Sequence, residues 1–416
     1  MPEDAPSAEH GESLSAALAA AVEADEDVRR QLVDALRGSD ESRRAVVAEM
    51  VRAGTAKRPA DAALPAVPVE IGRKLVGDPL GGWRRGPRRS LVIIGDSIAN
   101  QCSRMLRSTL RDALPGGTSF GYAGLAGGTF ASWEVAGEWD AVGATDANLG
   151  LPATPAAARR SPGGAGATLT WTCPPGWTVD DAEVHWVDDA ASGPAFSYRV
   201  DDGSWIEVAC TAPPGPAARR TSVGPVGAQV VLRATRADGA SVPSPVFLGL
   251  EARDHRAANV VHALTFPGGT IASRAGADSD ACLRPDRLDV ALAHLEQFEP
   301  SLILWETIND ARALDLDRLH AAIAAVQAAI PAAEHAAMCV YEVVDSSAQH
   351  AGQDELHGYL TRRFDAVVDF RARWGRPADA IAAGLLAPDG IHPTARRGSG
   401  DLAAALAGML ATDVGP

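Results

Sequence analysis

The sequence predicts an α/β fold in which helices cover both faces of a parallel sheet. The first observation is an alternation of short apolar runs with amphipathic segments, which starts at residues 90–94 and resumes after residue 257. The second is that polar motifs come directly after several of these apolar runs. The third is an interruption at residues 168–250, where short alternating strands are separated by turn signals.

The chain of 416 residues is too long for one ordinary hydrophobic core, so we expect more than one domain. The changes in pattern divide it into four segments. Residues 1–82 form a helical arm and linker, and residues 83–150 form the first part of the α/β domain. An inserted β-sandwich module follows at 151–254, and the second part of the α/β domain covers 255–416.

The N-terminal arm consists of a helical segment and a linker. Apolar residues recur at helical spacing over residues 13–53, and the linker at 54–68 is rich in Pro and Ala. One helical segment of this length cannot form its own core. Two interpretations stay open: the arm packs against other copies or a larger assembly, or it is solvated.

Composition and charge exclude several classes of function. The formal net charge of −15 disfavours binding to nucleic acid and to anionic membranes, both of which require clustered cations. The sequence has no apolar run of 18 residues, so we expect no transmembrane helix and no insertion into a membrane. The acidic start lacks an apolar signal region, which predicts synthesis in the cytoplasm without a secretory signal.

The five cysteines are scattered and include no Cys-x-x-Cys pair, a pattern typical of a reducing compartment. A disulfide between Cys173 and Cys210 is an open alternative, since both lie in the β-rich segment. No Cys/His spacing indicates a metal site, and the acidic runs are typical of solvated faces. We therefore predict no metal site.

The α/β elements can be followed in order along the chain. A buried strand at 90–94 precedes a helix at about 98–113, and a second buried strand follows the interruption at 259–264. The later elements alternate in the same way: helix 284–298, strand 300–304, helix 316–330, strand 336–344, a further helix, and strand 366–370.

The β-rich segment contains hairpin signals, "DDG" and "ADG", between alternating runs. It carries four of the nine tryptophans: Trp171, Trp177, Trp186 and Trp205. Alternation in a sandwich favours a core position for these rings over a sugar-binding platform. Trp177, in "PPGWTVDD", is the better candidate for a loop-borne ligand contact, and a carbohydrate-binding role for the module stays open.

Four motifs carry the candidate chemistry: "LVIIGDSIANQ" at 91–101, "LTFPGGTIAS" at 264–273, "WETINDAR" at 305–312 and "APDGIHPTARRG" at 387–398. Three of them follow predicted strands directly. Because the carboxyl ends of parallel strands meet at one edge of a sheet, Ser97, Gly268, Asn309, Asp389 and His392 are expected to converge.

These residues suit acyl transfer. Ser97 needs a base to attack a carbonyl, His392 can act as that base, and Asp389 can orient the imidazole. The backbone N–H groups of Ser97 and Gly268 and the amide of Asn309 would form an oxyanion hole. In the structural alternative, Ser97 is a turn residue, His392 lies on the surface and Asn309 caps the following segment; Asp310 is interpreted as structural.

In this order, the motifs resemble those of the GDSL-type SGNH hydrolases. The resemblance implies a flavodoxin-like three-layer domain that hydrolyses esters, often acetyl esters of polysaccharides, without a cofactor. The sequence departs from the family pattern at Thr307, where the family prefers Gly. The oxyanion glycine is ambiguous, because "GLAGGTFAS" with Gly124 and Gly127 also fits; chain order favours Gly268 over Gly127, and Gly269 lies beside it.

The sequence thus predicts a serine esterase that acts on O-acetyl groups of a carbohydrate polymer. Two alternatives stay open. The arm and the β module would suit a virion tail or cell-envelope appendage that binds surface glycans. The same site residues would also serve an O-acyltransferase, in which a sugar hydroxyl replaces water as the acceptor.

Overall fold

The computed structural model describes residues 80–125, 133–141, 159–162, 166–187, 195–209, 218–235, 244–266, 269–272, 281–283, 285, 288–343 and 352–411. The described residues belong to one compact unit, Val69–Pro416, and the predicted arm belongs largely to another, Met1–Pro68. The predictions on the N-terminal helix and linker, Gly127, Gly268 and Cys210 lie outside the described residues.

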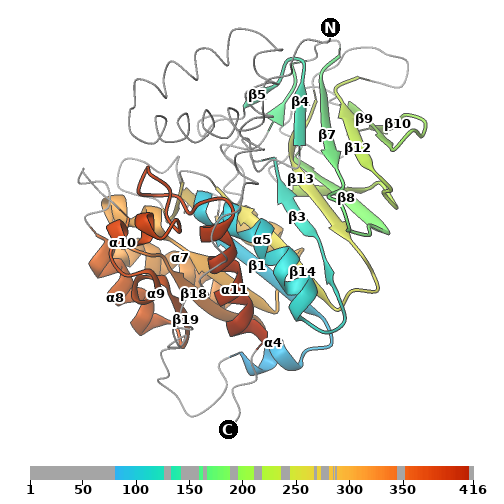
Figure 1. Ribbon diagram of the computed structural model, residues 1–416. Helices are drawn as coiled ribbons and strands as arrows, with labels where there is room; N and C mark the ends of the chain where they lie inside the picture. Colours follow the sequence, from blue (N-terminus) through green and yellow to red (C-terminus); the bar gives the residue numbers. More distant parts are fainter. Residues whose placement is uncertain are drawn as a thin grey trace, which may run out of the picture. The chain divides into compact units, whose positions relative to one another are not determined.

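A parallel sheet forms the centre of the α/β part (Figure 1). Its strands follow the order β14-β1-β17-β18-β19, and each neighbouring pair is parallel. Their bounds are β14 Asn259–Thr265, β1 Arg89–Gly95, β17 Leu302–Glu306, β18 Glu334–Cys339 and β19 Ala366–Asp369. Counted along the chain, with β14 second, this is the 2-1-3-4-5 order of flavodoxin-like folds.

Helices cover both faces of this sheet, as β1 illustrates. Leu91 and Ile93 belong to one core cluster, and the alternate residues Val92 and Ile94 belong to another. Because β1 is buried on both faces, its sequence is continuously apolar rather than alternating. The predicted three-layer α/β architecture is confirmed.

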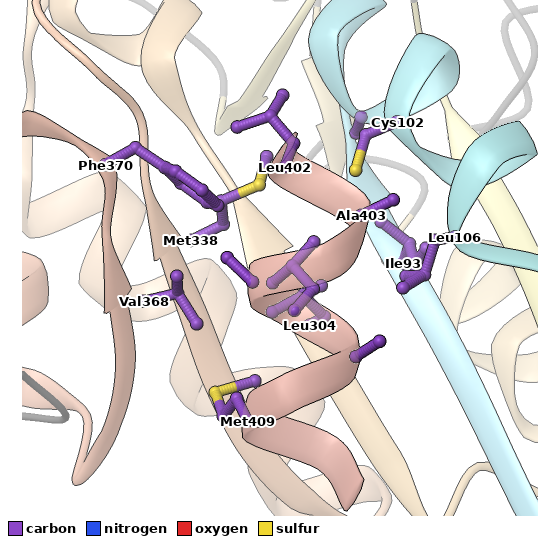
Figure 2. Packing of buried hydrophobic residues seen from close by; sticks show 14 of the residues in the cluster. Ile93, Cys102, Leu106, Leu304, Met338, Val368, Phe370, Leu402, Ala403 and Met409 are labelled. Carbon is purple, nitrogen blue, oxygen red and sulfur yellow. The ribbon is translucent and has the colours of Figure 1, made fainter. Parts of the chain in front are cut away.

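The first core cluster lies between the sheet and two long helices, α5 (Ser97–Ala113) and α11 (Arg397–Ala411). Figure 2 shows Leu106 of α5 beside Ile93 of β1, and Leu402 of α11 near Met338 and Phe370. The second cluster includes residues of α6 (Leu288–Glu296), α7 (Leu316–Ala329) and α8 (Gln353–Arg363). The shorter helices are α4 Gly81–Arg85, η3 Ile308–Ala313, α9 Phe370–Trp374 and α10 Pro377–Ala382.

The antiparallel strands extend the same sheet beyond β14 in the order β11-β8-β13-β3-β14. A separate five-stranded sheet has the order β10-β9-β12-β7-β4. The bounds are β2 Thr118–Ser119, β3 Gly121–Gly124, β4 Trp133–Ala136, β5 Asp140–Ala141, β6 Arg159–Arg160, β7 Thr168–Thr172, β8 Asp181–Val187, β9 Ala195–Val200, β10 Ile206–Ala209, β11 Ala218–Ser222, β12 Gln229–Arg233, β13 Val246–Arg253, β15 Thr270–Ala272 and β16 Ala281–Leu283.

A third core cluster joins the two sheets of this antiparallel part. It contains Trp171 of β7 and Trp186 of β8, so the core interpretation of these two rings is confirmed. Trp177 is half-buried, and its ring packs edge-on against Phe120 with the Arg111 guanidinium 5.1 Å away. Trp205 lies 3.9 Å from the Arg233 guanidinium, also half-buried.

The strands do not divide at the predicted module boundaries. β4 begins at Trp133, before residue 151, and pairs with β7. On the other side, β3 pairs with both β13 and β14, so the antiparallel strands and the parallel strands share one sheet. An inserted module at 151–254 stays a prediction. The alternative disulfide does not form, because Cys173 carries a free thiol.

In the described part of the chain, no helix is both long enough and apolar enough to cross a membrane.

A buried polar cluster lies where the antiparallel strands meet the parallel sheet. The Glu251 carboxylate on β13 faces His185 and His262, each with a ring nitrogen 3.6 Å from a carboxylate oxygen. It accepts a 2.6 Å hydrogen bond from Arg253 Nε, and His294 of α6 is bonded to His185 at 3.0 Å. Burial works to raise the pKa of Glu251, but the hydrogen bond from His185 and the charges of His262 and Arg253 lower it to about 2.

Acid should destabilise the protein through this cluster. Burial lowers the pKa of His262 to about 3 in the folded protein, from 6.5 for a free histidine. Between these two pH values, His262 is protonated in the unfolded chain but neutral in the folded protein, so acid favours unfolding. The free energy of unfolding should therefore fall by about 1.4 kcal/mol per pH unit for this histidine between pH 6 and 4. Urea denaturation at several pH values measures the slope.

His262→Asn should reduce the dependence of the unfolding free energy on pH. The matched control is His255→Asn, which replaces a histidine whose side chain is 57% exposed and should leave that pH dependence unchanged. Equal slopes in wild type and His262→Asn would contradict the assignment.

Candidate active site

The turn between β1 and α5 places Ser97 at the first position of the helix. Asp96 caps the helix, since its Oδ1 accepts a hydrogen bond from the Ile98 N–H at 2.8 Å. Gly95 is required by close packing: a Cβ there would lie 2.6 Å from the Ala99 Cβ and 2.8 Å from the Glu306 Cβ. Gly95 and Asp96 of the Gly-Asp-Ser sequence thus each have a local structural role.

Ser97 forms a hydrogen-bonded chain with the C-terminal motif. Its Oγ lies 3.0 Å from His392 Nε2, although the two residues are 295 positions apart in the sequence. His392 Nδ1 lies 2.8 Å from Asp389 Oδ2. The structure therefore brings together three of the residues selected from the sequence, in the arrangement that hydroxyl activation requires.

The Asp389 side chain also shapes the loop that carries His392. Its Oδ1 accepts hydrogen bonds from the N–H groups of Ile391 at 2.9 Å and His392 at 3.0 Å. Gly390 permits this tight turn with a φ of 70°. Partial burial acts to raise the pKa of Asp389, but these hydrogen bonds and the one to the imidazole lower it overall. The carboxylate is thereby kept ionised, as an acceptor for the imidazole N–H.

Tyr341 fixes the same loop from the end of β18. Its hydroxyl donates a 2.7 Å hydrogen bond to the Ile391 carbonyl, and its ring stacks on Trp374 with centroids 4.2 Å apart. The sequence analysis missed Tyr341. The predicted strand at 336–344 contained Tyr341, whereas β18 ends at Cys339, and nothing in the sequence indicates which carbonyl the tyrosine reaches.

Asn309 lies in η3, directly after β17, and is 4% exposed. In the described part of the chain, its side chain has no hydrogen-bonded partner. The following helix is capped by Asp315, not by Asn309. Asp310 accepts hydrogen bonds from the N–H groups of Ile271 and Ala272 at 2.9 and 3.1 Å, in line with its structural interpretation.

The glycine segment after β14 begins beside the serine turn, because the Phe266 N–H donates to the Gly95 carbonyl at 2.7 Å. Gly269 closes a tight turn, and a Cβ there would lie 1.7 Å from the Phe266 ring. Gly268 lies between them, outside the described residues. Gly124 pairs with Gly249 in the antiparallel part of the sheet.

Glu306 is a further residue that the sequence analysis missed. It ends β17, is 1% exposed and accepts hydrogen bonds from the N–H groups of Asp96 and Ile308, both at 2.9 Å. Burial first, and then the charge and hydrogen bonding of Glu306, raise the pKa of Asp96 well above its usual value. Two carboxyl groups are thus buried beside Ser97.

One group of described side chains has the donor types of a metal site: Glu183, His185 and Glu251, with ligand atoms within 4.8 Å of one another. Both carboxylates already face an arginine, Glu183 at 3.0 Å from Arg220 and Glu251 at 2.6 Å from Arg253. These ion pairs account for the carboxylates without an ion. The expectations of no metal and no cofactor stay predictions.

The candidate site is open to solvent. The His392 side chain is 34% exposed and the Asp389 side chain 49% exposed. In the 2-1-3-4-5 strand order, β14 lies on one side of β1 and β17 on the other, so the direction in which strands are added reverses at β1. Ser97 and Asn309 follow the carboxyl ends of β1 and β17, which is the crevice where ligands bind in open α/β sheets.

Comparisons with known proteins agree with this fold. No protein-family model matches the sequence, and no curated protein does. A solved structure of a peptidoglycan O-acetylesterase matches with a TM-score of 0.57 and 16% identity, over 79% of this chain and 93% of that chain. A family two carbohydrate esterase from Clostridium thermocellum, solved with cellohexaose, matches 65% of this chain and 97% of its own at 12% identity, with a TM-score of only 0.25.

The first of these matches shows that the two chains share a fold. The three-layer α/β fold that the resemblance to the GDSL-type SGNH hydrolases implied is therefore also the fold of this O-acetylesterase.

Proposed function

We propose that the protein is a serine esterase that removes O-acetyl groups from a carbohydrate polymer. The observation that carries the proposal is the hydrogen-bonded chain from Ser97 through His392 to Asp389 at the carboxyl edge of the parallel sheet. The shared fold with an O-acetylesterase supports the same reaction class.

The geometry supports a two-step reaction. His392 Nε2 takes the proton of Ser97 Oγ while the oxygen attacks the ester carbonyl, and Asp389 stabilises the imidazolium. The tetrahedral intermediate collapses to an acetyl-serine, and the sugar hydroxyl leaves with the proton from His392. Water, deprotonated by His392, then attacks the acetyl-serine and releases acetate, which restores Ser97.

Charge on the carbonyl oxygen would be stabilised by three donors. The Ser97 N–H is at the first position of α5, where a helix has no internal acceptor for it. The buried Asn309 amide is the second donor. The Gly268 N–H is the third, proposed from its place in the sequence between Phe266 and Gly269.

The exposure of the site favours a substrate larger than a buried small molecule. Because His392 and Asp389 are each at least one-third exposed, an acetyl group projecting from a polymer can reach Ser97. The matched O-acetylesterase is described as acting on peptidoglycan, and an acetylated glycan is accordingly the substrate class we propose. An O-acyltransferase would use the same groups with a sugar hydroxyl in place of water.

Replacement of the proposed nucleophile should abolish the reaction. We expect Ser97→Ala to lower kcat for p-nitrophenyl acetate by at least about 10³-fold, because no other group forms the acetyl intermediate. Ser108→Ala, on the same helix, is the matched control and should retain wild-type kcat. Activity that survives in Ser97→Ala would place the reaction elsewhere.

Loss of the Asn309 amide should weaken transition-state binding more than substrate binding. Asn309→Ala is expected to lower kcat by about 10²–10³-fold with little change in KM, since its amide would contact the oxyanion only as charge develops. Steady-state kinetics measures this division, and the melting temperature shows whether the variant is folded. A folded variant with wild-type kcat would remove Asn309 from the oxyanion hole.

The glycan assignment has its own test. Acetate release from O-acetylated peptidoglycan and from O-acetylated xylan, each measured beside Ser97→Ala, distinguishes the substrate class. If Ser97 is needed to hydrolyse p-nitrophenyl acetate but neither polymer releases acetate, the protein is an esterase whose substrate is not one of these glycans.

A further inference from the structure

We propose that Glu306 is a positioning residue that holds the serine turn and the asparagine turn of the site in register. This inference rests on the proposed function, since it concerns how Ser97 and Asn309 are placed for the reaction. Glu306 itself is not proposed to contact the substrate, because its carboxylate is occupied by backbone groups.

The hydrogen bonds of Glu306 connect two segments that are far apart in the sequence. One carboxylate oxygen accepts from the Asp96 N–H, and the other accepts from the Ile308 N–H, both at 2.9 Å. Each anchored N–H belongs to the residue immediately before a proposed site residue, Ser97 in one case and Asn309 in the other. One side chain therefore sets the spacing between the nucleophile and an oxyanion donor.

Neighbouring strands explain why Glu306 can reach both turns. β1 and β17 are paired in register from Leu91 with Leu302 to Ile94 with Trp305, so Gly95 lies beside Glu306. A Cβ at Gly95 would lie 2.9 Å from the Glu306 carboxylate, and only a glycine leaves that space open. Gly95 and Glu306 thus form a matched pair at the carboxyl ends of two strands.

A carboxylate suits this position better than an amide. An ionised carboxylate accepts at both oxygens, and its hydrogen bonds to buried N–H groups are stronger than neutral ones. A glutamine would offer one acceptor and direct its NH₂ group toward the other N–H. One of the two turns would then lose its anchor, whichever way the amide is oriented.

The decisive variant is Glu306→Gln, which we expect to lower kcat for p-nitrophenyl acetate by about tenfold or more while KM changes less than about twofold. The chain offers a matched control at Glu334. That carboxylate also accepts from two backbone N–H groups, Gly82 at 2.7 Å and Trp83 at 2.9 Å, but at α4 and away from Ser97. Glu334→Gln should affect the melting temperature without lowering kcat.

Glu306→Asp is the second variant, for the case in which Glu306→Gln does not fold. It keeps the charge but shortens the side chain, so we expect its kcat to lie between those of wild type and Glu306→Gln. Wild-type kcat in a folded Glu306→Gln, or in Glu306→Asp when Glu306→Gln does not fold, would overturn the proposal.

Ser97→Ala, measured in parallel, separates this inference from the proposed function. If wild type hydrolyses the ester and Ser97→Ala does not, the function stands and the Glu306 variants test the positioning role alone. If hydrolysis does not depend on Ser97, the proposed function fails, and the positioning role fails with it.

Discussion

The hydrogen bond between Ser97 and His392 depends on β1, a buried strand that lies between β14 and β17 in the parallel sheet. β1 is packed on both faces and paired on both edges, so the position of its last residue is determined by the whole α/β core. Ser97 itself is half-buried and directly follows this buried segment. On the other side, Asp389 and Tyr341 hold the His392 loop through its backbone. A half-exposed site can thereby keep a defined geometry.

Backbone N–H groups held by buried carboxylates recur around the site. Glu306 anchors the turns before Ser97 and Asn309, and Asp310 anchors Ile271 and Ala272 after the glycine segment. The segments that follow β1, β14 and β17 are thus connected by two acidic side chains of one motif, Glu306 and Asp310 of "WETINDAR". These hydrogen bonds fix the orientation of the backbone around the site, and the carboxylates that accept them do not need to contact the substrate.

The sequence was sufficient for the parallel sheet, its covering helices and the pairing of Ser97 with His392 and Asp389. Periodicity identifies strands buried on both faces, and parallel strands bring their following loops to one edge. It was insufficient for Glu306 and Tyr341, whose roles depend on which backbone groups lie beside them in the fold. Nor could it show that β3 joins the antiparallel strands to the parallel sheet, because strand pairing is non-local. Gly268 stays a prediction from chain order.

The central claim is that Ser97 is an activated nucleophile, and covalent labelling tests it most directly. A fluorophosphonate forms a bond from serine Oγ to phosphorus with loss of fluoride, and it reacts rapidly only with an activated serine. Intact-mass and peptide analysis of the full chain should show one adduct, on the peptide that contains Ser97, and a much slower reaction in His392→Gln. No adduct on the folded protein, or an adduct on another serine, would contradict the account.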